Sequence, residues 1–334
     1  MKDGKPIVWI LDDEWKNHQM ENEIFRDNGM TLKVTNSKSL LKDLPEYAPC
    51  ADGVIVQVGF NCGEEIISQL DTCKVMATYG VGYNHIDLTA ANRKGIPVCN
   101  VPDYCIEEVS DHTVALVLAV VRRIKSYGNQ VRNGHWDALD TMPIKRIKDM
   151  TIGLLGFGRI ARAVAYKLRS FGPRLIAHDK YVHREEFAEY GVVPVSREQL
   201  IQQSNLLSLH IPLTPETENI LNLENMKLMP KGAFIVNTCR GGVINEDDLL
   251  SLLESGHLGG AGLDVLKQEP PNADYPLLNM SELLITPHAS YISESSVDEL
   301  RKRTCQHILD GVKGNSLSNV VNLSELFDGH ASTK

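Results

Sequence analysis

Short runs of β-branched and aliphatic residues alternate with helix-length amphipathic stretches along almost the whole chain. This alternation is typical of parallel β-sheets whose strands are joined by covering helices. In the first hundred residues it predicts strands at 7–11, 32–34, 53–58, 74–77 and 96–99. A second series predicts strands at 151–155, 174–178, 206–210, 233–237, 260–263 and 283–286. We therefore expect an α/β protein with two doubly wound parallel-sheet domains.

The 334 residues are enough for two domains, each with a core of its own. A stretch that is almost wholly apolar in its middle predicts one long buried helix from about Cys105 to Tyr127. We expect one domain built from residues 1–102 plus 290–334 and a second, central domain at 103–289. The tail at 320–326 is expected to cross back onto the first domain.

Composition argues against several classes of protein. The chain has 34 Lys and Arg against 43 Asp and Glu, and a net charge of −9 disfavours a broad surface for nucleic acid or anionic lipid. Its longest apolar run, 114–121, is far shorter than the roughly 20 residues of a membrane span. The seven scattered cysteines contain no C-x-x-C pair, which favours reduced thiols over disulfides or zinc. We expect a cytoplasmic protein without a metal, a nucleic-acid partner or membrane contact.

A glycine-rich segment follows the predicted strand 151–155 and opens a predicted helix. Its spacing is G-x-G-x-x-A, in which Gly156 permits the tight turn and Gly158 allows close approach of a pyrophosphate. Ala161 takes the place of the third glycine, where close packing of helix on strand needs a small residue. The N-terminus of the helix offers free N–H groups to phosphates, and Arg159 adds a positive charge.

Asp179, at the end of the next predicted strand, strengthens this interpretation. A carboxylate there accepts hydrogen bonds from the ribose hydroxyls and repels a 2′-phosphate, which favours NAD over NADP. The neighbouring Lys180 weakens that preference slightly. A tight turn followed by an exposed aspartate is the alternative, and the strand–helix–strand context argues against it.

Three later segments place chemically active side chains after predicted strands. Arg240 lies in a glycine-rich turn, Glu269 precedes two prolines, and His288 follows the last strand. Loops at the carboxyl ends of parallel strands converge on one ligand crevice. Arginine can grip a carboxylate and its neighbouring carbonyl bidentately. A histidine can exchange a proton with that carbonyl as hydride moves, and an adjacent glutamate favours the protonated imidazole.

Each of the three has an ordinary structural explanation when taken alone. An arginine in a glycine turn is often part of a surface ion pair, a glutamate before prolines is often an exposed loop charge, and a Pro-His pair often ends a strand. Their joint placement downstream of a nucleotide motif favours the catalytic interpretation.

Six segments resemble the D-isomer-specific 2-hydroxyacid dehydrogenases, the family of D-lactate, glycerate and phosphoglycerate dehydrogenases. They are YGVGYNHID (79–87), VPDYCIEEVSDHTVAL (101–116), GLLGFGRIARAVA (153–165), NTCRGGVINEDDLL (237–250), GLDVLKQEPP (262–271) and TPHASY (286–291). The resemblance covers most of the chain from about residue 50 onward. Within the family the chain is most similar to the C-terminal-binding-protein branch, because a large aromatic, Tyr291, follows the histidine by three residues.

The resemblance implies roles for individual residues. Arg240, Glu269 and His288 form the implied catalytic set. The implied NAD site comprises Gly156, Gly158, Arg159, Ile160, Asp179, His210, Thr238, Cys239, Arg240, Asp264 (near the carboxamide) and Thr113 (at the nicotinamide). The backbone of Val81 and Gly82 is implied to hold the substrate carboxylate in a glycine-lined anion nest, although an ordinary strand-to-helix bend explains this turn equally well. Tyr104 and Tyr291 take positions that either face substrate or pack between domains.

The implied activity is reversible hydride transfer between NADH and a small 2-oxo acid, in a homodimer. The domain of residues 1–102 plus 290–334 is then the substrate domain, and the central domain at 103–289 is a Rossmann NAD-binding domain. The acid itself stays open among lactate, glyoxylate, hydroxypyruvate, glycerate and branched-chain compounds, and phosphite dehydrogenase carries a similar Arg–Glu–His set. The alternative is an NAD-sensing scaffold or corepressor of the C-terminal-binding-protein type with weak turnover.

Overall fold

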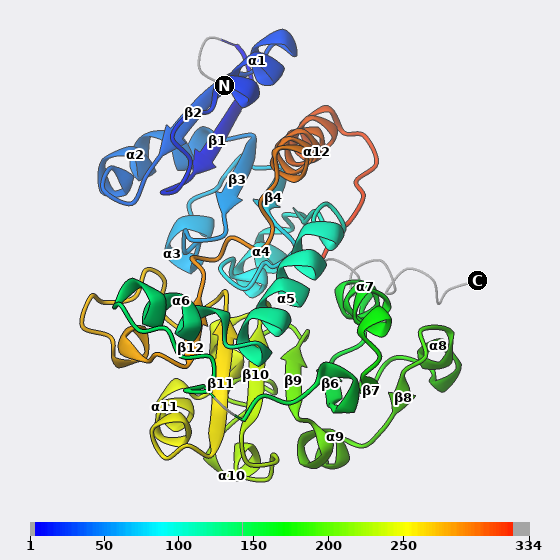
Figure 1. Ribbon diagram of the computed structural model, residues 1–334. Coiled ribbons are helices and arrows are strands. Elements are labelled where there is room, and N and C mark those ends of the chain that lie inside the picture. Colours follow the sequence, from blue (N-terminus) through cyan, green and yellow to red (C-terminus); the bar gives the residue numbers. More distant parts are fainter. Residues whose placement is uncertain (1–3, 142, 323–334) are drawn as a thin grey trace. The chain divides into compact units, whose positions relative to one another are not determined.

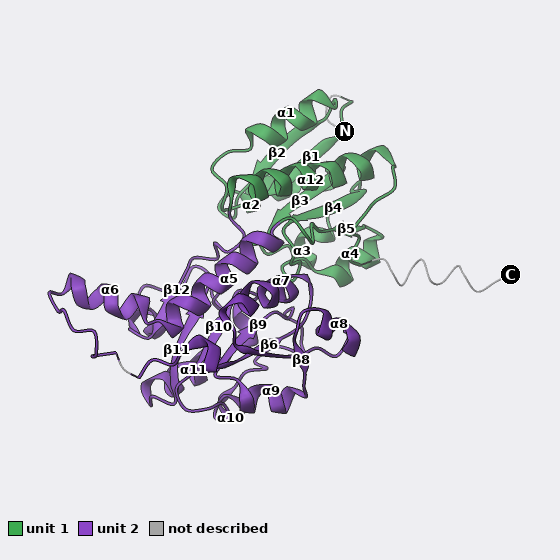
Figure 2. Ribbon diagram, turned by 45° about the vertical axis from the view of Figure 1, so that its right-hand side comes forward, with its two compact units in different colours: residues 1–104, 293–334 green, residues 105–292 purple. Residues whose placement is uncertain are grey.

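The computed structural model describes residues 4–141 and 143–322. The chain divides into two compact units, which we call unit 1 (residues 1–104 and 293–334) and unit 2 (residues 105–292) (Figure 2). The boundaries expected from the sequence, after residue 102 and before residue 290, and the role assigned to each domain stay predictions.

Unit 1 is built on a parallel sheet with the strand order β2-β1-β3-β4-β5 (Figure 1). This is one of the two common doubly wound orders. The strands are β1 (Ile7–Leu11), β2 (Thr31–Thr35), β3 (Gly53–Gln57), β4 (Val75–Tyr79) and β5 (Val98–Cys99). The helices are α1 (Gln19–Asp27), α2 (Leu40–Tyr47), α3 (Glu64–Ile67), α4 (Leu88–Lys94) and α12 (Glu294–Lys313). Every residue of β1, β3 and β4 is buried, as expected for parallel strands covered on both faces.

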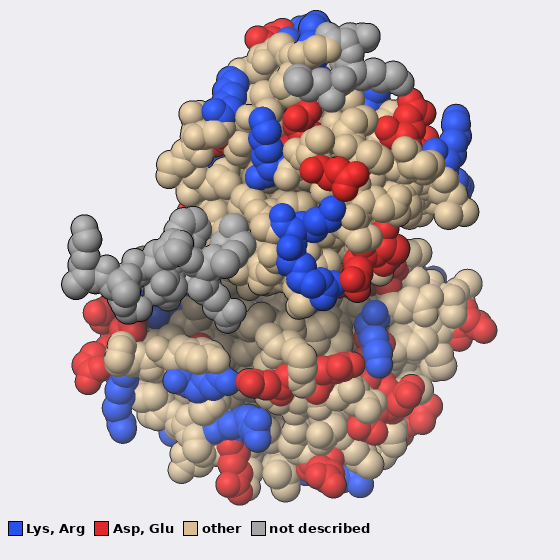
Figure 3. Space-filling view, turned by 180° about the vertical axis from the view of Figure 1, so that it is seen from behind, with Lys and Arg blue, Asp and Glu red and all other residues tan. Residues whose placement is uncertain are grey.

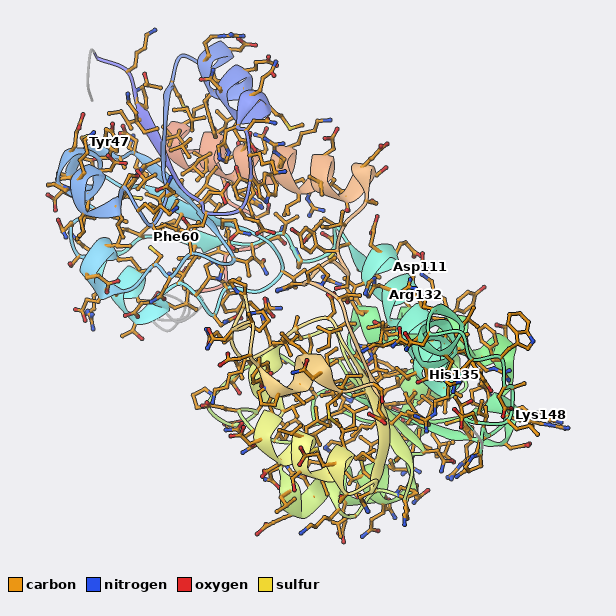
Figure 4. All side chains as sticks on the ribbon, turned by 60° about the vertical axis from the view of Figure 1, so that its left-hand side comes forward. Tyr47, Phe60, Asp111, Arg132, His135 and Lys148 are labelled. Carbon is orange, nitrogen blue, oxygen red and sulfur yellow. The ribbon has the colours of Figure 1, made fainter. Side chains whose placement is uncertain are left out.

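The C-terminal helix α12 belongs to unit 1 because it packs closely on β3 and β4. A Cβ on Gly53 would lie 2.8 Å from Cγ2 of Ile308, and one on Gly311 would lie 2.4 Å from Val75. Beyond α12, Val320 pairs with Cys99 of β5. Residues 323–326 of the expected tail lie outside the described residues. Phe60 points into the core of this unit, and Tyr47 packs at the margin of that core (Figure 4).

Unit 2 is built on a second parallel sheet, with the order β12-β11-β10-β9-β6-β7-β8. Its strands are β6 (Thr151–Leu155), β7 (Arg174–His178), β8 (Val193–Pro194), β9 (Leu206–Leu209), β10 (Ala233–Asn237), β11 (Leu258–Leu263) and β12 (Leu283–Ile285). Its helices are α5 (Ile106–Val121), α6 (Ile124–Arg132), α7 (Arg159–Leu168), α8 (Arg184–Glu189), α9 (Arg197–Gln203), α10 (Leu223–Met226) and α11 (Glu246–Glu254). The strand order reverses between β6 and β9, which makes this a Rossmann-type sheet. The prediction of two doubly wound parallel sheets is confirmed.

The prediction of one helix from Cys105 to Tyr127 is wrong. The chain breaks between α5 and α6 at Arg123, whose φ of 55° is left-handed. The Arg123 guanidinium donates a hydrogen bond to the carbonyl of Gly259 and lies 5.1 Å from the ring centroid of Phe234. These contacts to residues distant in sequence hold a backbone conformation that an arginine does not favour by itself.

The apolar character of α5 is explained by burial inside unit 2. Leu116, Val117 and Val120 join one core, on the same face of the sheet as α7. In β10, Phe234 and Val236 pack into that core, whereas Ile235 packs into the core on the opposite face. Alternating side chains of one strand therefore reach two cores, because helices cover both faces.

The molecular surface carries mixed charge. On the face drawn in Figure 3, acidic and basic side chains are interspersed. Within the described ranges no helix is both long and apolar enough to cross a bilayer. In the same residues no group of three or more histidine, cysteine or carboxylate side chains is placed to hold a metal ion. All seven cysteines are free thiols, and the cytoplasmic location stays a prediction.

Candidate active site

Most of the predicted site residues of unit 2 follow strands of its sheet. Because these strands are parallel, the loops after them lie along one edge. The residues that directly follow or lie shortly after a strand are Gly156 (β6), Asp179 (β7), His210 (β9), Thr238, Cys239 and Arg240 (β10), Asp264 and Glu269 (β11) and His288 (β12). The topology thus places the nucleotide turn and the three polar loops on the same side of the sheet.

The turn after β6 has the geometry that its glycines predict. Gly156 has a φ of +90°, and a Cβ there would lie 2.4 Å from the carbonyl oxygen of His210. Gly158 is the N-cap of α7, and no atom lies within 4 Å of the position that its Cβ would take. Arg159 is exposed in the first turn of the helix, with Ile160 beside it, and Ala161 is fully buried. The open N-terminus of α7 therefore fits a dinucleotide pyrophosphate.

Asp179 is fixed by two backbone N–H groups. Its Oδ2 accepts from Phe157 at 2.8 Å, and its Oδ1 accepts from Tyr181 at 2.8 Å. Each carboxylate oxygen has two acceptor sites, so both keep capacity for the hydroxyls of a ribose. The neighbouring Lys180 is directed to Glu216 by an exposed ion pair of 3.0 Å. The predicted adenosine-side carboxylate is thus held rigidly beside the glycine turn.

His210 is a neutral imidazole at this edge. Its Nε2 lies 2.9 Å from the Ser208 hydroxyl. Burial lowers the pKa of His210 from 6.5 to about 4. The side chain therefore carries no charge at neutral pH and acts in hydrogen bonding and packing.

The turn after β10 is clasped by the side chain of Asn237. Its Oδ1 accepts from the Cys239 N–H at 3.0 Å, and its Nδ2 donates to the Arg240 carbonyl at 2.8 Å. Burial raises the pKa of the Cys239 thiol, so the thiol stays protonated. Thr113 of α5 lies 2.8 Å from the Thr238 hydroxyl, and both threonines are buried. This packing ties α5 to the loop that carries Arg240.

Glu269 and His288 form a hydrogen-bonded pair. The His288 Nδ1 donates to Oε2 of Glu269 at 2.6 Å, and both side chains are about one-third exposed. The other carboxylate oxygen of Glu269 accepts from the Leu266 N–H at 2.8 Å. With Nδ1 committed to Glu269, Nε2 is the ring nitrogen left for another partner. The Tyr291 ring lies edge-on at 6.3 Å from the imidazole.

Asp264 holds the loop that carries His288. Its buried carboxylate accepts from the Thr286 hydroxyl at 2.6 Å and from the N–H groups of Ala289 and Ser290 at 2.9 Å. The Asp264 carbonyl accepts from the His288 N–H at 2.7 Å. His288 itself has a left-handed φ of 53°, which is costly for a residue with a side chain. The Asp264 contacts stabilise this conformation.

Backbone packing links the Arg240 turn to the Glu269–His288 pair. A Cβ on Gly241 would lie 1.9 Å from the carbonyl carbon of Leu266. Only glycine permits this approach, and Leu266 is the residue whose N–H binds Glu269. The loop that carries Arg240 therefore contacts the loop that carries Glu269, and Glu269 in turn contacts His288.

Val81, Gly82 and Tyr104 lie in unit 1, and their substrate roles stay predictions. The turn that carries the first two is anchored by the Asn100 side chain, which donates to the Val81 carbonyl at 2.7 Å. The Val101 N–H donates to the Gly80 carbonyl at 3.0 Å. Tyr104 is buried.

Two polar residues that were not predicted from the sequence contact the site loops. His112 lies 3.0 Å from the Thr286 hydroxyl, and because that hydroxyl donates to Asp264, the His112 Nε2 is the donor. Glu246 accepts from the Lys267 N–H at 2.6 Å. Both lie inside segments already noted for other residues, beside Thr113 and after Arg240, which was the available signal.

Comparison with known proteins identifies the family. Residues 114–290 match the sequence model of the NAD-binding domain of D-isomer specific 2-hydroxyacid dehydrogenases. The chain belongs to this family. Its central region is thus an NAD-binding domain, as predicted, and the glycine turn and Asp179 fit that cofactor.

Three similar proteins illustrate the range of the family. Glyoxylate reductase of Korarchaeum cryptofilum is 34% identical over 77% of this chain and 79% of its own length. D-3-phosphoglycerate dehydrogenase of Methanocaldococcus jannaschii is 34% identical over 85% of this chain, which spans about half (54%) of that longer protein. The structure of D-lactate dehydrogenase of Aquifex aeolicus, complexed with NAD and lactic acid, is 29% identical, with a TM-score of 0.85 over 92% of this chain and 96% of its own.

The two glycines of the turn allow a matched test of the cofactor site. We predict that Gly156→Ala lowers the free energy of unfolding by about 2–4 kcal/mol, because it combines a left-handed φ with backbone overlap. Gly158→Ala keeps the fold, because space is open, but its methyl group stands at the helix N-terminus and weakens NADH binding about tenfold or more. Denaturant unfolding and NADH fluorescence titration measure the two effects. Equal loss of stability in both variants contradicts this account of the turn.

Proposed function

We propose that this protein catalyses reversible hydride transfer between NADH and a small 2-oxo acid. The Glu269–His288 pair, with a 2.6 Å hydrogen bond at the same sheet edge as the nucleotide turn, is the observation that carries the proposal. The nicotinamide cofactor supplies or accepts the hydride when it is bound. All the other steps belong to side chains of the chain itself.

His288 is the proposed acid–base group. Its Nδ1 is bound to Glu269, so Nε2 gives a proton to the substrate carbonyl oxygen during reduction and removes it during oxidation. Glu269 orients the ring and places a carboxylate beside it. Arg240 has five N–H donors, of which one binds the Cys239 carbonyl at 2.6 Å. Its planar guanidinium suits bidentate recognition of the carboxylate and carbonyl of a 2-oxo acid.

The substrate class follows from this set of charges and from the relatives. The three similar proteins are named for phosphoglycerate, glyoxylate and lactate, which are all 2-hydroxy or 2-oxo acids. Each is named a dehydrogenase or a reductase, so the alternative of a corepressor draws no support from them. We therefore propose a small 2-oxo acid and leave its side chain open.

A homodimer is proposed from the exposed apolar side chains of α6 and the loop after it. Ile124, Val131, Trp136 and Leu139 are 53–90% exposed, and Trp136 is the most exposed of them. Arg132 and His135 mark this segment in Figure 4. Clustered apolar side chains of this size are typical of contact surfaces, and a second copy is the proposed occupant.

The activity is tested by NADH consumption with a panel of 2-oxo acids. We predict that His288→Gln lowers kcat about 10²–10⁴-fold, the usual contribution of a positioned acid–base group. Arg240→Lys raises KM for the oxo acid, because an ammonium cannot reproduce the guanidinium fork. Glu254→Gln, an exposed change in the same unit, serves as the control. Tight NADH binding without turnover of any acid contradicts the proposed activity.

The pH dependence tests the roles of the pair. The rate of reduction should fall as pH rises, because His288 must be protonated, and the rate of oxidation should rise over the same range. Glu269→Gln removes the negative charge beside the imidazole, so both profiles should shift along the pH axis. His210, with a pKa of about 4, stays neutral across this range and does not contribute to either profile. Unchanged profiles in Glu269→Gln would remove Glu269 from the acid–base assignment.

Asp179 tests the cofactor preference. We predict a higher kcat/KM with NADH than with NADPH, because the Asp179 carboxylate repels a 2′-phosphate. Asp179→Asn keeps the size of the side chain but removes the charge, and should reduce the ratio of NADH to NADPH efficiency at least tenfold. Lys180→Met is the control, because that ammonium is already paired with Glu216. A wild-type preference for NADPH would contradict this assignment.

Light scattering tests the dimer. The wild-type protein should have twice the chain mass of 37.1 kDa at micromolar concentration. Trp136→Ser should shift the mass toward 37.1 kDa by removing the largest exposed apolar group of the segment. Leu41→Ser changes an equally exposed apolar residue in unit 1 and should have no effect. A wild-type mass of one chain is the contrary result.

A further inference from the structure

Glu246, the first residue of α11, is a buried carboxylate outside the proposed catalytic set. It is only 9% exposed, and both of its oxygens accept hydrogen bonds. Oε1 accepts from the Lys267 N–H at 2.6 Å, and Oε2 accepts from the Tyr275 hydroxyl. Both donors come from the segment after β11, which also carries Glu269.

The start of α11 does not need Glu246 for its own stability. Asn245 is the N-cap and accepts from the Asp248 N–H at 3.2 Å. Asp247 and Asp248 place two more negative charges in the first turn, where the helix dipole favours them. Glu246 instead reaches across to a loop 21 residues further along the chain. A carboxylate buried in this way depends on its donors, because burial without them costs several kcal/mol.

The peptide between Leu266 and Lys267 is held from two sides. Glu246 binds the Lys267 N–H, and the backbone of Gly241 packs against the carbonyl of Leu266. The N–H of Leu266 then binds Glu269, whose second oxygen binds His288. A short path of hydrogen bonds thus runs from Glu246 to the imidazole.

We propose that Glu246 is a positioning residue that acts with Tyr275 to hold the Glu269 carboxylate against His288. It touches neither substrate nor cofactor in this account and acts through the Leu266–Lys267 peptide. The inference rests on the proposed dehydrogenase activity for its catalytic consequence, but the contact itself can be measured without turnover.

Tyr275 is suited to be a constant donor. Burial, and then its hydrogen bond to Glu246, raise the pKa of the Tyr275 phenol well above its ordinary value. The phenol therefore stays protonated throughout the pH range of an enzyme assay. The Tyr275 hydroxyl can therefore donate to Glu246 at every pH of such an assay.

Steady-state kinetics of Glu246→Ala, Glu246→Gln, Tyr275→Phe and the control Asp247→Ala test the catalytic consequence. Glu246→Ala should lower kcat about 10–100-fold with KM for NADH unchanged within twofold, and should move the pH profiles in the same direction as Glu269→Gln. Glu246→Gln keeps one oxygen for the Lys267 N–H, so its pH profiles should lie closer to those of the wild type than to those of Glu246→Ala. Asp247 is exposed beside Glu246, so Asp247→Ala should leave kcat and the profiles unchanged.

A double-mutant cycle separates positioning from general destabilisation. In the Glu269→Gln background, Glu246→Ala should lower kcat by less than a further threefold, because the carboxylate that Glu246 positions is already absent. The proposal is overturned if Glu246→Ala lowers kcat equally in the wild type and in Glu269→Gln. It is also overturned if the pH profile of Glu246→Ala is the same as that of the wild type. If Glu246→Ala does not fold, Tyr275→Phe takes its place, because this variant loses only a single oxygen. It should change kcat and the pH profile in the same direction by a smaller amount. Additive effects of Tyr275→Phe and Glu269→Gln on kcat would also overturn the proposal.

Hydrogen–deuterium exchange over residues 265–275 tests the contact independently of activity. The Lys267 amide should exchange at least tenfold faster in Glu246→Ala than in the wild type and in Asp247→Ala. Unchanged protection overturns the proposal. If no 2-oxo acid is turned over by the wild type, the proposed function fails, and the exchange result alone still decides whether Glu246 holds this loop.

Discussion

The parallel pairing of β6 with β9 is the constraint from which the site in unit 2 follows. The chain leaves β6 toward β7 and β8, then returns to the other side of β6 and continues from β9 to β12. The two halves diverge from this pair, so the loops after β6 and β9 lie at the switch point, where open parallel sheets bind ligands. Gly156 must be a glycine because the carbonyl of His210 closes the turn from the β9 side.

Buried carboxylates stabilise the loops that this edge presents. Asp264 accepts three hydrogen bonds from residues 286, 289 and 290, which flank His288. A left-handed residue with a side chain costs on the order of 1–3 kcal/mol. Hydrogen bonds to a charged group contribute roughly 1.5–3 kcal/mol each. The contacts of Asp264 therefore outweigh the strain at His288 and fix the direction of its ring, and Glu246 does the same for the neighbouring loop.

The pattern of apolar residues predicted the strands whose bounds depend on nearby residues alone. The strands at 7–11, 151–155, 174–178 and 233–237 were predicted with their observed bounds, because each is a buried apolar run between turn residues. The break at Arg123 was not predicted, because a carbonyl and an aromatic ring far along the chain stabilise it. The edge strand β8 was missed because two half-exposed residues carry no periodicity.

The site was likewise predicted in part, because its residues can be identified from sequence motifs but their contacts depend on packing. The family motifs indicate which residues gather at the edge, but not which carboxylate binds which loop. The two imidazoles at this edge illustrate the difference. Burial without a carboxylate lowers the pKa of His210 to about 4 and leaves it neutral, whereas His288 is part-exposed and hydrogen-bonded to Glu269. Both residues follow a strand of the same sheet, so position alone cannot distinguish them. The environment therefore favours His288 over His210 for the proposed proton transfer, because only His288 of the two is hydrogen-bonded to a carboxylate and part-exposed.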